Sequence, residues 1–407
     1  MNNITIISGY YFPEDTAIGL YNTQLVKFLE SKGYIVTVVT GFPSYPQWKI
    51  REDYNNKKAF YTEFIGKTKI IRYKQFVPKS PTFFKRILLL LDFTFGSFFN
   101  VFKIKDCDLV ISVVPHTSTL FLGWVLKKRK KAKLWNHIQD FEFDAAHQTG
   151  LSSNTSLMKK ILFRTLFKME SALLNRGVVN STISYKMISK LKTKSHRPTF
   201  YFPNWIDESK IDPSSANPHS YLSSSKFKIL YSGNIGDKQD WEFFIDFATC
   251  LDRKKVEIIV VGDGAKREWL HKKISQLEIA KYYEPVAYEE LTDLLCSADL
   301  HFLFQKHDVI DSVMPSKLLG MMASGVPSLI TGNIESEVNL VINESKGGFY
   351  VNERNISKCL TIVEELIEDP SKGVEIGKKA RNYVIDKFAS EKVLSKFESM
   401  IENVLNE

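Results

Sequence analysis

The sequence predicts an α/β protein made of two doubly wound domains that face each other across a cleft. Short apolar runs, typical of buried strands, alternate with helical patterns along the chain. The 407 residues are enough for two full-sized hydrophobic cores, and a polar segment rich in proline and serine separates two halves of opposite charge. Such alternation is typical of parallel sheets covered by helices on both faces.

The first half contains six patterns that predict strands. They lie at Ile4–Ser8, Val36–Thr40, Lys69–Tyr73, Leu109–Val114, Leu134–Ile138 and Val178–Ser181. Three segments between them show the apolar spacing of helices, at Leu20–Lys32, Ser118–Lys130 and Ser156–Leu174. The second half repeats the plan with strands at Lys228–Ser232, Glu257–Val261, Leu300–Phe304 and Pro327–Thr331.

These patterns predict a first domain at 1–206, a linker at 207–226 and a second domain at 227–389. The linker is polar and contains Pro213 and Pro218. The last segment, 390–407, is a helical pattern that could pack back across the cleft.

Charge divides at the same place. Residues 1–206 carry 31 Lys and Arg against 13 Asp and Glu, and residues 207–407 carry 24 against 33. A basic half could face nucleic acid, an acidic small molecule or an anionic membrane. Neither a zinc-finger spacing nor an RNA-binding motif is present, so the sequence predicts no nucleic-acid partner.

The cellular compartment is predicted from the cysteines and the first residues. The four cysteines, at 107, 250, 296 and 359, form no C-x-x-C pair and are typical of buried thiols in a reducing compartment. The first twenty residues lack a basic start and contain Glu14 and Asp15, so we expect no signal peptide. The prediction is a cytoplasmic protein.

The segment around Pro315-Ser316-Lys317 predicts a short helix that binds phosphate. Pro315 suits the first helical position, and Gly325 suits the left-handed position after the end. The unpaired amides of the first turn, the Ser316 hydroxyl and the Lys317 ammonium would form a site for phosphate groups. Core packing gives no reason for Ser-Lys in the first turn, although an ordinary capped helix is the alternative.

Two glycine turns follow strands of the second half. In the first, Gly233 would let the backbone approach a ligand, while Asn234 and Lys238 lie in the turn and Lys238 supplies a counter-charge for phosphate. An ordinary strand-to-helix turn with an exposed lysine is the alternative. In the second, Gly262-Asp263 ends the next strand, and a structural turn and a ligand contact are equally open for Asp263.

We predict no catalytic metal. Asp106-Cys107-Asp108 formally matches a metal-binding D-x-D motif, but it precedes a strand and is interpreted as a strand-entry turn. His116, His137 and His147 lack ligand spacing, so we expect them to be hydrogen-bonded or exposed.

The segment Phe83–Lys103 is apolar but contains Asp92 and Asn100, and its length argues against a spanning helix. A helix buried in the first domain and a helix at the membrane interface both remain open. The basic run Lys127–Lys131 and the mixed run Met158–Met169 favour peripheral association with an anionic membrane.

Short motifs recur along the chain in a fixed order. They are Tyr10-Tyr11-Phe12-Pro13-Glu14, Ile18-Gly19-Leu20-Tyr21-Asn22-Thr23, Val38-Val39-Thr40-Gly41, Ile138-Gln139-Asp140-Phe141-Glu142, Phe202-Pro203-Asn204-Trp205, Tyr231-Ser232-Gly233-Asn234-Ile235-Gly236, Val261-Gly262-Asp263-Gly264 and 313–327. In this order and spacing, over essentially its whole length, the chain resembles the family 4 retaining glycosyltransferases of the GT-B fold, which has two Rossmann-like domains. The branch it is most similar to makes colanic acid and capsular exopolysaccharides.

This resemblance implies transfer of a sugar from a nucleotide diphosphate to an acceptor, with retention of configuration and without a cofactor. The donor would be a UDP- or GDP-sugar, and the acceptor a saccharide, often one carried on polyprenyl diphosphate at the inner face of the membrane. Gly19 would lie near the donor phosphates, with a plain hinge as the alternative, and Val286 near the base.

The resemblance also implies catalytic positions in the first domain. Many relatives have a histidine near the place of Gln139, so its replacement shifts the expected role to Asp140, which would orient the acceptor and balance oxocarbenium-like charge. Helix capping by Asp140 is the alternative. Glu142 and Asp144 are expected to face solvent. The family's second glutamate is replaced by Gly320, which together with Gln139 leaves a non-catalytic partner of a polysaccharide assembly complex as an alternative. A nucleotide-sugar epimerase of the same fold is a second alternative.

Overall fold

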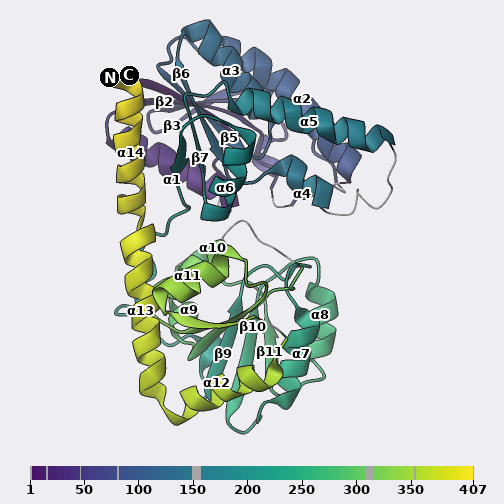
Figure 1. Ribbon diagram of the computed structural model, residues 1–407, viewed down its shortest axis with the longest axis vertical. Coiled ribbons are helices and arrows are strands. Elements are labelled where there is room, and N and C mark those ends of the chain that lie inside the picture. Colours follow the sequence, from purple (N-terminus) through teal and green to yellow (C-terminus); the bar gives the residue numbers. More distant parts are fainter. Residues whose placement is uncertain are drawn as a thin grey trace. The chain divides into compact units, whose positions relative to one another are not determined.

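The computed structural model describes residues 2–14, 17–45, 47–79, 82–148, 157–308, 315–352 and 354–406. The chain divides into two compact units (Figure 1). The first comprises Met1–Pro203 together with Leu394–Glu407, and the second comprises Asn204–Val393. Each unit is built on one sheet, so the expected α/β class with two doubly wound domains is confirmed.

The first unit contains an eight-stranded sheet in the order β3-β4-β2-β1-β5-β6-β7-β8. All neighbours pair in parallel except β3 and β4, which form an antiparallel hairpin. The strands are β1 (Asn3–Ile7), β2 (Ile35–Gly41), β3 (Phe60–Ile65), β4 (Thr68–Tyr73), β5 (Leu109–Val114), β6 (Lys133–Ile138), β7 (Val179–Thr182) and β8 (Thr199–Tyr201).

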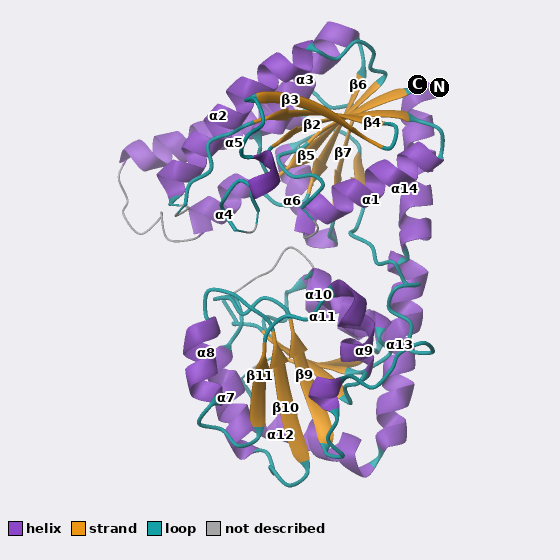
Figure 2. Cartoon of the chain, turned by 180° about the vertical axis from the view of Figure 1, so that it is seen from behind, coloured by secondary structure: helices purple, strands orange, loops and turns teal. Residues whose placement is uncertain are grey.

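Helices cover both faces of this sheet (Figures 1 and 2). They are α1 (Ala17–Ser31), α2 (Phe83–Phe102), α3 (Ser118–Lys130), α4 (Glu142–Gln148), α5 (Leu157–Leu174), α6 (Tyr185–Lys194) and α14 (Ser390–Asn406). Right-handed crossovers place α2, α3 and α5 on one face and α1 on the other. On α14, the ring of Phe397 lies 4.0 Å from that of Phe202 and 4.6 Å from that of Trp135, so the end of the chain completes the core of the first unit.

The second unit contains a six-stranded parallel sheet in the order β11-β10-β9-β12-β13-β14. Its strands are β9 (Phe227–Ser232), β10 (Val256–Val261), β11 (Ala280–Tyr283), β12 (Leu300–Phe304), β13 (Ser328–Thr331) and β14 (Gly348–Val351). Its helices are α7 (Trp241–Cys250), α8 (Arg267–Ile274), α9 (Leu291–Cys296), α10 (Ser316–Ala323), α11 (Glu337–Ser345), α12 (Ile356–Glu368) and α13 (Pro370–Phe388).

The strand order of the second sheet reverses between β9 and β12. In doubly wound folds, ligands usually bind at the carboxyl ends of the two strands that flank such a reversal. The segment that we predicted as a linker, 207–226, lies within the second unit. There Leu222 is buried in the core, and the Tyr221 ring stacks 3.9 Å from that of Tyr283.

Helix α2, which spans most of the segment Phe83–Lys103, buries one face and exposes the other. Phe93 and Val101 are buried in the core of the first unit. Asp92 faces the sheet, where its carboxylate accepts hydrogen bonds from the Tyr73 hydroxyl at 2.9 Å and the Phe76 amide at 2.6 Å. The other face exposes six large apolar side chains, here called the α2 stripe: Phe84, Leu88, Leu91, Phe95, Phe99 and Phe102.

Candidate active site

The carboxyl ends of β9 and β10 meet in two interlocked turns. The Gly233 amide donates to the Val261 carbonyl at 2.9 Å, and the Ile235 amide donates to the Asp263 carbonyl at 2.8 Å. A Cβ atom on Gly262 would lie 1.9 Å from the Gly233 carbonyl oxygen, so only glycine fits this approach. The structure therefore brings together four predicted site residues, Gly233, Asn234, Gly262 and Asp263.

Lys317, on α10, lies against the first of these turns. Its ammonium donates to the Tyr231 hydroxyl at 2.6 Å and lies 4.4 Å from the centre of the Tyr231 ring. The Tyr231 hydroxyl in turn donates to the Asn234 carbonyl at 2.5 Å. Burial raises the pKa of Tyr231 well above its usual range, so this phenol stays neutral and positions Lys317 at the end of β9.

The start of α10 differs from the expectation by one residue. Pro315 is the N-cap rather than the first helical residue, because its ψ of 128° is extended, and the helix begins at Ser316. The Leu318 amide donates to the Pro315 carbonyl at 3.0 Å. The end agrees with the prediction, since Gly325 has a φ of +69°. The residues Val313 and Met314 lie outside the described residues.

Other predicted residues of the second unit are placed less directly. The Lys238 carbonyl accepts from the Lys306 amide at 3.0 Å, so Lys238, which is exposed, lies beside the end of β12. The Asp263 carboxylate accepts from the Gly264 amide at 2.8 Å and pairs with Arg267 at 3.5 Å. These contacts agree with the alternative that Asp263 stabilises the turn. Val286 is half-buried against the core of the unit, and no described contact links it to Lys317.

In the first unit, Gly19 and Gln139 are held by packing and hydrogen bonds within the protein. Gly19 lies in the first turn of α1, where a Cβ atom would lie 2.6 Å from the Glu14 carbonyl oxygen. This close approach explains the glycine without a phosphate. Gln139 is buried, and its backbone N–H donates to the Val114 carbonyl at 2.9 Å. Asp140 is exposed just before α4, at the carboxyl end of β6.

Two carboxylates near Asp140 do not simply face solvent, contrary to the prediction. Glu142 accepts from the Thr117 amide at 2.9 Å and hydroxyl at 3.0 Å, so it caps the start of α3. Asp144 pairs with Lys190 at 2.8 Å and Lys194 at 2.7 Å. Both are held by partners because the edge of the sheet is crowded by the neighbouring helices.

Sequence reasoning missed a buried polar cluster at the same edge. The His116 ring lies 5.0 Å from that of Tyr10, and Nδ1 of His116 has no hydrogen-bond partner within the described chain. Burial lowers the pKa of His116, so the imidazole is neutral. His116 is thus only partly hydrogen-bonded, through the backbone of Pro115, whereas His137 is hydrogen-bonded to the Ser181 hydroxyl at 2.9 Å and His147 is exposed, as expected.

Glu14 completes this cluster. Its carboxylate accepts from the amides of Ser44 at 2.8 Å and Tyr45 at 2.9 Å. Burial is the largest influence and raises the pKa of Glu14 to about 7, although these two hydrogen bonds lower it. Glu14 stands in the first motif of the family resemblance, and that motif was the one signal that could have identified it.

The D-x-D motif has a structural role, because the Asp108 carboxylate accepts from the Asn3 amide at 2.7 Å and fixes the start of β1. Within the described ranges, no three His, Cys, Asp or Glu side chains are arranged to hold a metal ion. Among those residues there is also no helix both long and apolar enough to cross a membrane.

A family model described as glycosyl transferases group 1 matches residues 216–383, which include both glycine turns and α10. The colanic acid biosynthesis glycosyl transferase WcaI of Escherichia coli strain K12 is 34% identical over 343 residues, which cover 81% of this chain and 83% of that protein. The chain belongs to the group 1 glycosyl transferases. Because the family and this relative are named for transfer, the epimerase and scaffold alternatives gain no support.

Solved structures agree with the fold of this glycosyltransferase. Sucrose-phosphate synthase from Thermosynechococcus elongatus superposes with a TM-score of 0.75 over 100% of both chains, at 14% identity. Anabaena HepE, crystallised in complex with UDP, superposes with a TM-score of 0.67 over 99% of this chain and 100% of its own, at 15% identity. At these identities, the likeness confirms the two-domain GT-B architecture and nothing finer.

Proposed function

We propose that this glycosyltransferase moves a sugar from a UDP- or GDP-sugar to a saccharide acceptor in bacterial surface polysaccharide synthesis, with retention of configuration. The observation that carries the proposal is the fixed position of Lys317 against Gly233, where a Cβ atom on the glycine would lie 3.4 Å from the Lys317 ammonium. A cation would thus lie where the backbone of the β9 turn could approach a ligand most closely, which supports the proposal.

The second unit would hold the leaving nucleoside diphosphate. Charge develops on the pyrophosphate as the sugar departs, and a preorganised ammonium next to backbone amides offsets it without reorganisation. Lys317 supplies that charge, while Lys238 and the start of α10 add to it. The relative HepE, crystallised with UDP and with UDP-glucose, supports a uridine nucleotide as one of the two donor classes.

The first unit would present the acceptor at the carboxyl edge of its sheet. Asp140 is exposed there, and a carboxylate at that edge can orient an acceptor hydroxyl and balance positive charge on the sugar ring. Buried Glu14 and neutral His116 shape the adjacent wall. We assign no step to a metal ion, and Asp108 is already used in fixing β1.

The acceptor would be carried on polyprenyl diphosphate, with the enzyme docked on the inner face of the membrane through the α2 stripe. Its six side chains are between 46% and 75% exposed and recur at helical spacing. Lys103 lies over the Phe60 ring at 4.6 Å and Arg129 over the Phe102 ring at 5.0 Å, so cations border the apolar surface. This combination suits an anionic interface.

A transfer assay with the full chain tests the proposal. UDP- and GDP-sugars are supplied with a polyprenyl-diphosphate-linked saccharide, and products are followed by mass spectrometry and by the anomeric signals in NMR. Lys317→Ala should lower turnover by about 100- to 1,000-fold, the range found when one preorganised donor is removed. Lys272→Ala, at an exposed position of α8, is the matched control. Near-normal turnover of the Lys317→Ala protein would remove Lys317 from the site.

A further inference from the structure

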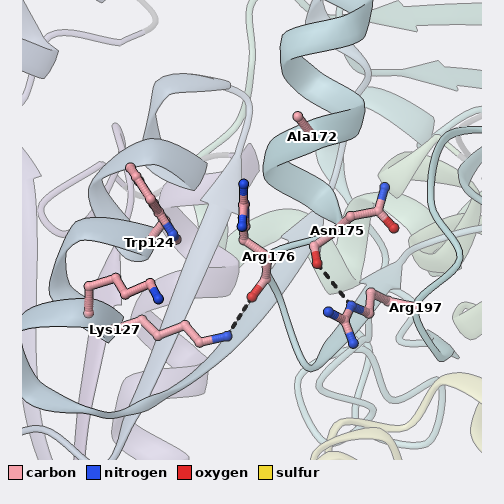
Figure 3. A pocket seen from close by; sticks show the side chains of 7 residues that line it. Trp124, Lys127, Ala172, Asn175, Arg176 and Arg197 are labelled. Carbon is pink, nitrogen blue, oxygen red and sulfur yellow. Dashed lines mark hydrogen bonds between the residues drawn. The ribbon is translucent and has the colours of Figure 1, made fainter.

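A basic pocket lies in the first unit between the last turns of α3 and α5 (Figure 3). Its volume is about 350 Å³, which falls within the range of about 300–1,000 Å³ for small-ligand sites. The side chains that define it are Trp124, Lys127 and Lys128 from α3, Arg176 from the turn after α5, and Arg197 from the segment before β8.

This pocket is separate from the candidate active site. Helix α3 leads into β6, α5 leads into β7, and Arg197 precedes β8, so the pocket lies at the amino ends of these strands. Gln139 and Asp140 follow β6 and lie at the opposite edge of the sheet. A ligand bound here would not take part in sugar transfer.

The charge of the pocket is only partly explained by local structure. The Lys127 ammonium donates to the Arg176 carbonyl at 2.6 Å, and the Arg197 guanidinium donates to the Asn175 carbonyl at 2.9 Å (Figure 3). Such bonds are ordinary at helix ends. They do not explain why Lys128 and Arg176 converge on the same cavity, since the pocket lining described here includes no carboxylate.

The four cations repel one another. Burial is the largest influence lowering the pKa of Lys127, and Arg197, Lys128 and Arg176 lower it further. An anion in the cavity would offset this repulsion. Trp124 adds a second observation, because its indole N–H is buried without an acceptor among the described residues. The Arg176 guanidinium lies 5.8 Å from the indole centre and forms the adjacent wall.

We propose that this pocket binds a phosphate group, held by Arg176, Arg197 and Lys128 with the Trp124 indole as its wall. Guanidinium groups donate in a planar fork that matches phosphate oxygens, and an ammonium adds a point charge. The phosphate could belong to a free ion or to a lipid headgroup. Arg129, next to Lys128 in sequence, lies over Phe102 of the α2 stripe, so helix α3 contributes cations both to the pocket and beside the proposed membrane surface.

Titration of the full chain with inorganic phosphate, at constant ionic strength and followed by calorimetry, tests the site. It is done on the Lys317→Ala protein, so that the phosphate site proposed in the second unit contributes little. Adding K128Q and R176Q should weaken binding at least tenfold, because neither side chain makes a described bond to the backbone. The control K254Q/K272Q removes the same charge from exposed positions of the second unit and should leave the affinity unchanged.

A second experiment, with lipid vesicles, identifies the source of the phosphate. Flotation compares phosphatidylcholine vesicles containing phosphatidic acid with vesicles of equal charge containing phosphatidylserine. A lipid headgroup is indicated if K128Q/R176Q lowers binding to phosphatidic acid at least fivefold more than K254Q/K272Q does. Equal vesicle binding together with lost phosphate binding indicates a free ion. Either result supports the pocket.

The proposal is overturned if the parent protein shows no saturable phosphate binding, or if K128Q/R176Q binds phosphate as tightly as its parent. Circular dichroism checks that the variant is folded. Should it fail that check, the single variants K128Q and R176Q decide the matter, because each removes one charge from the pocket and should weaken phosphate binding at least threefold. Binding as tight as that of the parent in both single variants overturns the proposal.

Discussion

Tyr231 is the residue on which the geometry of the second-unit site depends. Its hydroxyl accepts from Lys317 and donates to the Asn234 carbonyl, so one buried group ties α10 to the turn after β9. The ring also packs 5.3 Å from that of Phe302 and 4.8 Å from that of Trp241. The aromatic core of the unit thus fixes the position of a surface cation.

Tyr231→Phe should separate positioning from charge. The ring packing is kept, whereas the Asn234 carbonyl and the Lys317 ammonium both lose a partner. We expect nucleotide affinity to fall about tenfold and the free energy of unfolding to fall by about 1–3 kcal/mol, the usual penalty for an unsatisfied group. Calorimetric titration with UDP and GDP and urea denaturation measure these. Unchanged affinity in both titrations would show that Tyr231 does not position Lys317 for binding.

Glu14 should make stability depend on pH. Its folded pKa of about 7 lies above the ordinary 4.5, so the folded state holds the proton more tightly. That contribution is complete below about 4.5 and is lost as the pH rises through 7. Relative to Glu14→Gln, the free energy of unfolding of the natural chain should therefore fall by about 3 kcal/mol between pH 4.5 and 7.5.

Urea denaturation at several pH values measures this difference. His116, whose pKa burial lowers, titrates in both proteins and cancels from the comparison. Gln can still accept from Ser44 and Tyr45, so the variant should fold. Glu52→Gln, on an exposed residue, is the control. A constant difference across the pH range would show that Glu14 ionises as an ordinary carboxyl.

At the scale of elements, the buried central strands were predictable and the edge strands were not. Runs such as Leu109–Val114 are buried at every position, which makes the apolar pattern continuous. The unpredicted strands β3, β8, β11 and β14 are short or half-exposed; β3, for example, alternates exposed and half-buried residues. Their pairing depends on the neighbouring strand rather than on their own pattern.

The candidate site shows the same division. Glycine turns and Lys317 could be predicted because strand ends and helix starts carry local signals. Tyr231 and His116 could not, because each acquires its role from burial and from partners distant in sequence, and Glu14 was indicated only by its place in the first motif. Asp263 and Gly19 also stand in motifs, and the structure shows local packing around both, so their contact with a ligand stays a prediction.

The α2 stripe gives a prediction about one helix face. Burying an apolar side chain of this size contributes about 1.5–3 kcal/mol, so Leu91→Gln with Phe95→Gln should lower partition onto anionic vesicles more than tenfold. The core face of α2 is untouched, so folding should be unaffected. Flotation measures the partition, and high salt should weaken it without abolishing it, because the apolar contribution remains.

Ile334→Gln with Val374→Gln is the matched control. Both residues are 56% exposed and belong to the second unit, whereas the α2 stripe belongs to the first. Loss of flotation in this control to the same extent would assign the effect to general surface polarity. Equal flotation of the natural chain and the α2 variant would exclude the stripe as the docking surface.

At the scale of the molecule, the two units have separate cores and opposite net charge, and the features proposed for membrane docking and for nucleotide binding lie in different units. The basic 1–206 half contains the α2 stripe and the basic pocket, whereas the acidic 207–407 half contains the Lys317 ammonium beside the Gly233 turn at the end of β9. The proposed nucleotide site therefore lies in the half whose net charge is negative, and the proposal depends on local geometry rather than on net charge.

Ligand stabilisation should accordingly be confined largely to one unit. A nucleotide at 100 times its Kd adds about 2.7 kcal/mol to the stability of the unit that binds it. For a domain of about 150–250 residues this raises the Tm by roughly 5–10 °C. We expect the transition of the second unit to rise with UDP or GDP, not with ADP, while the transition of the first unit moves far less.

Differential scanning calorimetry of the full chain resolves the two transitions and ranks the bases in one experiment. Lys317→Ala should lose most of the shift, whereas Lys272→Ala should keep it, because only the former adjoins the Gly233 turn. Each transition is assigned by a variant that destabilises one unit: Gly262→Ala, which forces a Cβ atom against the Gly233 carbonyl, lowers the Tm of the second unit alone. If nucleotides raise the other transition, or if Lys317→Ala keeps the full shift, the donor site is not at the ends of β9 and β10.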